Sequence, residues 1–161
     1  MPSRESPLFP PNFRDMLRAL SAERVDYLLV GGYAMGIHGF RRATADVDFW
    51  VRPTPENAVR VMRALVAFGA PLMGLTEADL VTPRTVFQIG VAPERIDILT
   101  SVSGVGFDDA WKQRITGTVD GIEIPVIGRS ALVQNKRASG RPKDRIDLDW
   151  LERHPPDPES A

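Results

Sequence analysis

Two aspartates separated by one residue occupy a segment, positions 45–51, whose other side chains are almost all apolar. Residues i and i+2 of a β-strand face the same side, so Asp46 and Asp48 are expected to point together, away from Val47 and Phe49. Neighbouring carboxylates repel each other and raise each other's pKa. A divalent cation would relieve the repulsion, and Mg²⁺ prefers carboxylate oxygens. The alternative is a solvent-facing strand edge with two hydrated aspartates.

A third carboxylate, Asp97, lies between Ile96 and Ile98 in another apolar stretch, predicted as a strand over residues 94–99. If this strand lies beside the first, the three carboxylates converge and could hold two metal ions about 3.5–4 Å apart for in-line phosphoryl chemistry. The alternative for Asp97 is an ion pair with Arg95 or another neighbour. The order of the strands in the sheet decides between these alternatives.

Gly31 and Gly32 follow a predicted strand over residues 25–30 and precede a predicted short helix over residues 33–40. Glycine lets the backbone approach a ligand closely, and a helix N-terminus offers free N–H groups to an anion. This turn could therefore hold phosphates, although glycine also commonly just ends a strand. It is neither a P-loop nor a dinucleotide-binding fingerprint, because the required glycine and lysine spacings are absent.

Positive charge gathers at two places that could meet phosphate. Arg42 precedes Thr44 just before the aspartate pair, and the segment 136–145 is the densest basic stretch. Arginine binds phosphate bidentately, and basic clusters attract nucleotides or RNA, but a solvated surface is the common alternative. In the second segment we expect Lys143 to pair locally with Asp144. The residues predicted to bind the nucleotide are Gly31, Gly32, Arg42, Thr44, Lys136, Arg141 and Lys143.

The elements that must position these residues alternate between helical and strand patterns. Thr54 and Gly69 predict the N-cap and the end of the clearest helix, and an Asp-Gly turn predicts a hairpin over residues 115–127. Such a mixture predicts an α/β or α+β fold with a mixed β-sheet flanked by helices. Further helices are predicted over residues 12–23, 107–114 and 130–138 and after the break at 140–142. The first of them is expected to be capped by Asn12 and the third by Ser130. A further strand is predicted over residues 85–90, and a helical turn over residues 76–81.

The chain has 161 residues, which suits a single domain over residues 1–154 with a disordered tail over 155–161. Residues 1–11 are expected to be irregular. A net charge of −1 provides no global field for nucleic acids or membranes. The lack of cysteine excludes disulfides and thiolate metal sites. Because no signal-peptide or membrane-spanning pattern is found, a cytoplasmic protein is expected.

The segment Val30-Gly31-Gly32, followed thirteen residues later by Asp46-Val47-Asp48-Phe49, resembles the signature of nucleotidyltransferases with a DNA polymerase β-like fold. Asp97 resembles the third carboxylate of that family, and the likeness covers residues 25–99. It implies Mg²⁺ and transfer of a nucleoside monophosphate from an NTP to an acceptor hydroxyl. By position, the glycines would hold the triphosphate and Asp46 and Asp48 would bind metal. Asp97 would bind metal and help to deprotonate the acceptor.

A narrower resemblance links residues 38–51 and 135–151 to small bacterial nucleotidyltransferase-like proteins, including the AbiEii type of toxin from toxin–antitoxin pairs. It suggests an antitoxin as a candidate partner, while the acceptor hydroxyl could belong to RNA or tRNA, to a protein or to a small molecule. Only about 60 residues follow Asp97, so the acceptor site would be an open cleft or would need a partner or a second copy. Two alternatives are a non-catalytic scaffold that binds RNA or a partner, and a phosphodiesterase.

Overall fold

The computed structural model describes residues 4–5 and 9–156. Within them, seven strands form one sheet in the order β1-β6-β7-β2-β3-β5-β4. At its centre β2 is antiparallel to β3, whereas β3 is parallel to β5 and β2 is parallel to β7. The predicted mixed sheet is therefore confirmed. The strands are β1 (Arg4–Glu5), β2 (Tyr27–Val30), β3 (Asp46–Val51), β4 (Val86–Ile89), β5 (Arg95–Leu99), β6 (Ile115–Val119) and β7 (Ile122–Val126).

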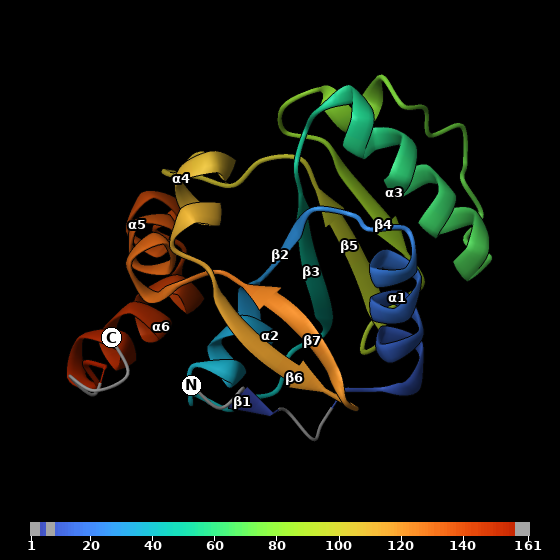
Figure 1. The fold of residues 1–161 in the computed structure, drawn as a ribbon. Helices are drawn as coiled ribbons and strands as arrows, with labels where there is room; N and C mark the ends of the chain where they lie inside the picture. The colour runs from blue at the N-terminus through green and yellow to red at the C-terminus, as the bar shows by residue number, and fades with distance from the viewer. Residues whose placement is uncertain (1–3, 6–8, 157–161) are drawn as a thin grey trace.

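Helices flank the sheet in two groups (Figure 1). One group is α1 and α3, which pack against each other, and the other contains α5 and α6, which also pack together. Between them, α2 packs on β2 and β3 and carries the glycine turn. The helices are α1 (Pro11–Ala22), α2 (Gly31–Ile37), α3 (Pro55–Phe68), α4 (Phe107–Lys112), α5 (Arg129–Ser139) and α6 (Pro142–Arg153), with a 3₁₀ turn η1 (Asp79–Val81).

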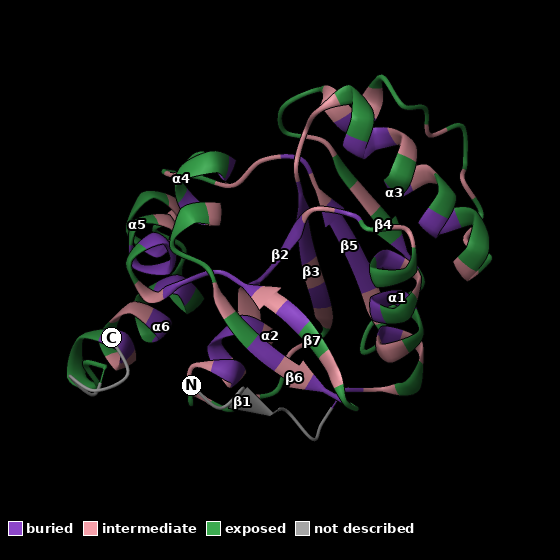
Figure 2. Ribbon diagram, in the orientation of Figure 1, coloured by how far each residue is buried: buried purple, intermediate pink, exposed green. Residues whose placement is uncertain are grey.

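The core lies along the central strands, which Figure 2 shows largely as buried. Every residue of β2 is buried, and Val47 and Phe49 of β3 have no exposed surface. Asp46 and Asp48, on the opposite face of the same strand, are only partly buried. The alternation along β3 therefore places the apolar side chains in the core and the carboxylates at an open face, as predicted.

Two local predictions are confirmed by the backbone. Thr54 accepts a hydrogen bond from the N–H of Asn57 at the start of α3, and Gly69 ends this helix with a left-handed φ of 89°. In the β6–β7 hairpin, Asp120 and Gly121 have positive φ values of 51° and 75°. This conformation matches the right-handed twist of the flanking strands.

Other predicted boundaries are wrong. Helix α1 begins at Pro11, because a proline at the first helical position has no N–H to lose, and its N-cap is therefore Pro10 rather than Asn12. Asn12 instead donates a side-chain hydrogen bond to the carbonyl of Glu94. Similarly, Gly128 rather than Ser130 is the N-cap of α5. The short helix α2 begins at Gly31 itself, so the glycines form its first turn.

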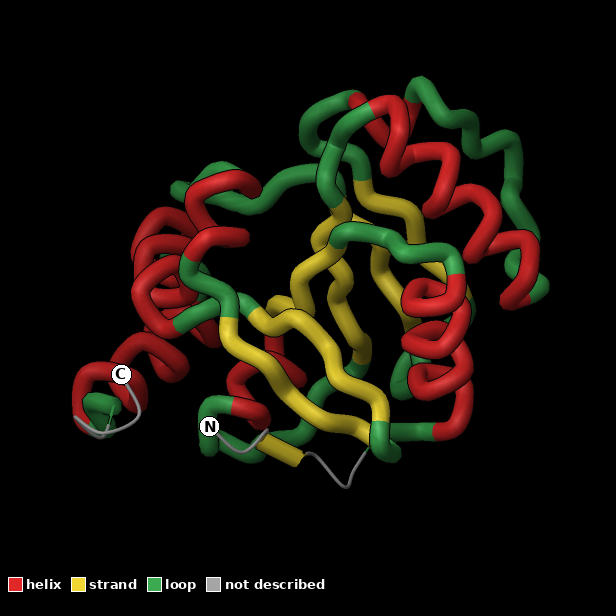
Figure 3. Tube along the Cα trace, in the orientation of Figure 1, coloured by secondary structure: helices red, strands yellow, loops and turns green. Residues whose placement is uncertain are grey.

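The sequence predicted one of two further segments. The expected irregular lead-in contains β1, which pairs in parallel with β6. The connection from α3 to β4 is mostly loop (Figure 3), and its 3₁₀ turn η1 confirms the helical turn predicted over residues 76–81. The predicted disordered tail falls largely on residues 157–161, which lie outside the described residues. No helix in the described part of the chain has the length and apolar character needed to cross a membrane.

Candidate active site

Three carboxylates converge where β3 and β5 run side by side. The strands are parallel neighbours, and Asp48 lies opposite Asp97 in their register. One oxygen from each of Asp46, Asp48 and Asp97 lies within 4.8 Å of the others. The strand adjacency that the sequence left open is therefore present, and the oxygen-only donor set suits a hard divalent cation.

Arg95 bridges this carboxylate cluster. Its Nε donates to Asp97 Oδ1 at 2.9 Å, and its Nη2 donates to Asp46 Oδ2 at 2.6 Å. The two alternatives for Asp97, convergence and an ion pair with Arg95, are thus both realised. Sequence reasoning treated Arg95 only as a competing explanation, although its i, i+2 spacing from Asp97 places both side chains on one face of β5.

The electrostatics of the cluster favour a proton or a cation. Burial, followed by the charges of Asp46 and Asp97, raises the pKa of Asp48 to about 7, against an opposing effect of Lys143. Burial also raises the pKa of Asp97, although the hydrogen bond from Arg95 opposes that change. Without a metal ion, the cluster therefore holds a proton on Asp48 at pH values below about 7.

This raised pKa predicts a pH-dependent stability of the metal-free protein. Because folded Asp48 holds its proton more tightly than the unfolded chain does, its contribution is fully present below about pH 4 and is lost as pH rises through about 7. We expect the gain in the free energy of unfolding from Asp48→Asn to be larger at pH 8 than at pH 5, by on the order of 1–3 kcal/mol. Urea unfolding of both proteins in EDTA measures this difference. An equal effect at both pH values would contradict the raised pKa.

The glycine turn lies directly against the carboxylates. Gly31 follows β2 with a φ of +72°, and a Cβ added there would lie 2.2 Å from Asp48 Oδ2. A Cβ on Gly32 would lie 2.9 Å from Thr44 Oγ1. Thr44 in turn donates a hydrogen bond to the backbone carbonyl of Asp46 at 3.1 Å. Both glycines are thus needed to bring α2 this close to β3.

Gly31→Ala is therefore expected to damage the site, because the new Cβ must displace Asp48 and the left-handed backbone disfavours alanine by about 1–2 kcal/mol. Mn²⁺ affinity, measured by electron paramagnetic resonance, should fall together with stability. Gly36→Ala in the same helix is the matched control, since its Cβ would meet nothing within 4 Å. Equal Mn²⁺ affinities in the two variants would show that the close approach of Gly31 does not matter.

A cavity adjoins this turn. Its volume is about 250 Å³, and it lies between α2 and the loop that leads into β3. Arg41 is exposed at its wall, and no hydrogen bond or ion pair links Arg41 to the rest of the described chain. The cavity shares Gly32 and Thr44 with the surroundings of the carboxylates. Its lining residues are Gly32, Tyr33, Gly36, Arg41, Arg42, Ala43 and Thr44.

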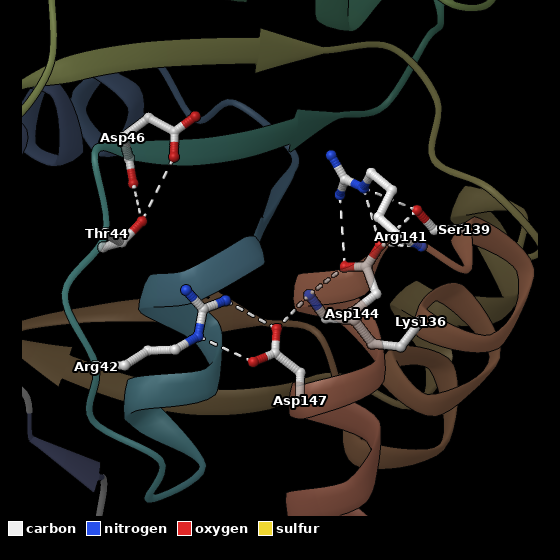
Figure 4. A network of polar contacts seen from close by, with 8 residues as sticks. All are labelled: Arg42, Thr44, Asp46, Lys136, Ser139, Arg141, Asp144 and Asp147. Carbon is white, nitrogen blue, oxygen red and sulfur yellow. Dashed lines mark hydrogen bonds and ion pairs between the residues drawn. The ribbon is translucent and has the colours of Figure 1, made fainter.

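Two of the predicted phosphate-binding residues are instead engaged in a buried network (Figure 4). Lys136, only 4% exposed, lies between Asp144 and Asp147, with Nζ at 3.2 and 2.8 Å from their carboxylate oxygens. Arg42 binds the same Asp147 through two hydrogen bonds of 2.9 and 2.8 Å. Their role in nucleotide binding stays a prediction, while their contacts anchor the loop before β3 to α5 and α6.

Arg141 and Lys143 differ in how they are engaged. Burial alone would raise the pKa of Asp144. Hydrogen bonds from Arg141, Ser139 and Lys136 instead hold that pKa well below its usual range. The expected local pair between Lys143 and Asp144 is wrong, because other cations already surround Asp144. Lys143 is exposed in the first turn of α6, and its charge acts on Asp48. Its positive charge therefore lowers the pKa of Asp48 without a hydrogen bond or ion pair between the two residues.

The mixed sheet, the glycine turn and the carboxylate cluster belong to one fold, which is similar to the fold of solved nucleotidyltransferase structures. Neither a family model nor a curated protein sequence matches this chain. Its structure is similar to that of TM1012, a candidate nucleotidyltransferase from Thermotoga maritima, with a TM-score of 0.57 and 17% identity over 88% of this chain and 91% of that one. It is also similar to the lincomycin-bound lincosamide antibiotic adenylyltransferase LnuA, with a TM-score of 0.57 and 15% identity over 91% of this chain and 98% of that one.

Proposed function

We propose that the protein is a Mg²⁺-dependent nucleotidyltransferase that moves a nucleoside monophosphate from an NTP to an acceptor hydroxyl. The observation that carries this proposal is the convergence of Asp46, Asp48 and Asp97 beside the Gly31-Gly32 turn. Burial and neighbouring carboxylates raise the pKa of Asp48, so the cluster is costly to ionise unless a cation binds it. The fold shared with LnuA and TM1012 supports the same conclusion.

The three aspartates would hold the metal, since they supply carboxylate oxygens within 4.8 Å of one another. When bound, Mg²⁺ would offset the charge of the triphosphate and make the acceptor hydroxyl more acidic. Asp97 would accept the proton of that hydroxyl, a role that is supported by burial, which raises its pKa and makes the carboxylate a stronger base. The acceptor oxygen would bond to the α-phosphorus while the bond from that phosphorus to the pyrophosphate oxygen breaks.

The remaining predicted residues would bind the triphosphate. The cavity beside Gly32 and Thr44 is open to the carboxylates' surroundings and carries the unengaged cation Arg41. Lys143 and Arg141 act electrostatically on Asp48 from the side of α6. These cations would bind phosphate oxygens from two sides. Arg42 and Lys136 could join them only by giving up Asp147, so we propose that they mainly position the loop before β3.

The acceptor class is the open part of this proposal. LnuA is an antibiotic adenylyltransferase bound to lincomycin, so a small-molecule hydroxyl stands beside RNA, tRNA and protein as a candidate. A toxin role with an antitoxin partner, a second copy that completes the acceptor site and a cytoplasmic location stay proposals from the sequence. One observation favours the non-catalytic scaffold as a second candidate: Arg95 already neutralises part of the carboxylate cluster without metal.

Incubation with each α-phosphate-labelled NTP, Mg²⁺ and a panel of acceptors tests the function. The panel should contain tRNA, total RNA, protein and lincomycin. We expect label to be transferred to one acceptor class, and we expect no transfer to that class when EDTA is present. Absence of transfer combined with no calorimetric binding of Mg²⁺ or NTP would support the scaffold. Release of free nucleoside monophosphate without an acceptor would support a phosphodiesterase.

A further inference from the structure

Arg95 occupies the position in the carboxylate cluster where a cation is expected. It lies opposite Asp46 in the β3–β5 register and two residues before Asp97, so all three side chains share one face of the sheet. Its guanidinium contacts both oxygens of Asp97, at 2.9 and 3.2 Å, and Oδ2 of Asp46 at 2.6 Å. Among the three proposed metal ligands, only Asp48 lacks a contact with Arg95.

The carboxylate cluster would carry three negative charges if every aspartate were ionised and Arg95 were removed. Arg95 supplies one positive charge through charge-assisted hydrogen bonds, which are stronger than neutral ones. A divalent ion would need some of the same oxygens, and its charge would repel the guanidinium at this distance. The Arg95 side chain is 32% exposed, so an outward rotamer into solvent is open to it.

The geometry points to Arg95 as an internal counter-ion that competes with the divalent metal for Asp46 and Asp97. It holds the carboxylates together in the metal-free protein and leaves them when metal binds, which frees its guanidinium for the phosphates of the substrate. This inference rests on the proposed metal site. The opposite role, in which Arg95 stays in place and orients Asp97 for the metal, predicts an effect of the opposite sign.

Mn²⁺ binding to the whole chain, measured by electron paramagnetic resonance without nucleotide, separates these two roles. We expect Arg95→Ala to bind Mn²⁺ about 3- to 10-fold more tightly than the wild type, a difference that corresponds to removing two partly exposed ion pairs. Arg95→Lys keeps the positive charge but lacks the planar guanidinium that contacts both aspartates, so its Mn²⁺ affinity should lie between those of the wild type and Arg95→Ala. Arg63→Ala, on the exposed face of α3, removes the same charge far from the carboxylate cluster and should leave the affinity unchanged.

A second measurement rules out a purely structural effect. In EDTA, Arg95→Ala should unfold at a lower temperature than the wild type, because three carboxylates then face one another without a cation. Saturating Mg²⁺ should raise its unfolding temperature by more than it raises that of the wild type, since tighter ligand binding stabilises the folded state more.

Weaker Mn²⁺ binding by Arg95→Ala, or an affinity equal to that of Arg63→Ala, would overturn the competition. If neither the wild type nor Arg95→Ala binds Mn²⁺, the metal site itself fails and the inference fails with it. Wild-type Mn²⁺ binding without any nucleotide transfer would instead count against the proposed function and leave the competition between Arg95 and metal intact.

Discussion

The double substitution Asp46→Asn/Asp48→Asn is expected to reduce nucleotide transfer at least about 10³-fold, because the loss of several kcal/mol of metal-derived transition-state stabilisation slows the reaction tenfold for each 1.4 kcal/mol. Both residues belong to the carboxylate cluster, and amides bind Mg²⁺ far less well than carboxylates. Label transfer to the acceptor identified for the wild type, followed over time with saturating NTP, measures the effect.

The same double variant should remain folded. Asparagine keeps the size of aspartate and removes both the cost of burying a charge and the charge repulsion, the two causes that raise the pKa of Asp48. The matched control is Asp109→Asn/Glu123→Gln, which removes the same two charges at exposed positions on α4 and β7. Near-normal transfer by the Asp46/Asp48 variant, with a control that behaves like the wild type, would show that the reaction does not depend on this acidic pair.

Lys136→Met is expected to destabilise the protein by about 3–5 kcal/mol, since it removes the buried ammonium that contacts both Asp144 and Asp147 and leaves their carboxylate oxygens without that donor. Lys136 is 4% exposed, and Asp144 and Asp147 have no exposed surface. Without Lys136, Asp144 still accepts hydrogen bonds from Arg141 and Ser139, but Asp147 keeps only Arg42 as a charged partner. Urea unfolding followed by far-ultraviolet circular dichroism measures the free energy of unfolding.

The control for this prediction is Lys112→Met, at an exposed position of α4, which should change stability by less than about 0.5 kcal/mol. A double variant, Lys136→Met/Asp147→Leu, should be less destabilised than the sum of its single changes, because it removes a buried charge together with its partner. A cost below about 1 kcal/mol for Lys136→Met would mean that the buried network contributes little to the fold.

The buried network also relates stability to the site. Arg42 lies two residues before Thr44, and Thr44 contacts both Gly32 and the backbone of Asp46. The pair between Arg42 and Asp147 therefore ties α6 to the loop that leads into β3, whose first residue is the proposed metal ligand Asp46. The same contacts mean that Arg42 and Lys136 would have to give up Asp147 before they could bind phosphate.

Local patterns in the sequence were enough to predict the elements and the face on which the carboxylates lie. The i, i+2 spacing of Asp46 and Asp48, flanked by the fully buried Val47 and Phe49, required one polar and one apolar face of β3. The cap at Thr54 was equally local, because it depends on residues within one turn. The cap at Asn12 failed for the converse reason: its side chain is used by Glu94, which is 82 residues away.

Only the tertiary structure decided which side chains meet. Asp97 joins the aspartate pair because β5 inserts beside β3 rather than elsewhere in the sheet. Arg95 reaches Asp46 across 49 residues of chain, and Arg42 reaches Asp147 across 105. The sequence by itself thus determined the types of residue, their faces and the possibility of a metal site. Strand order and helix packing depend on burying the whole core at once, so the convergence of the carboxylates and the pairing of the basic residues appear only in the folded chain.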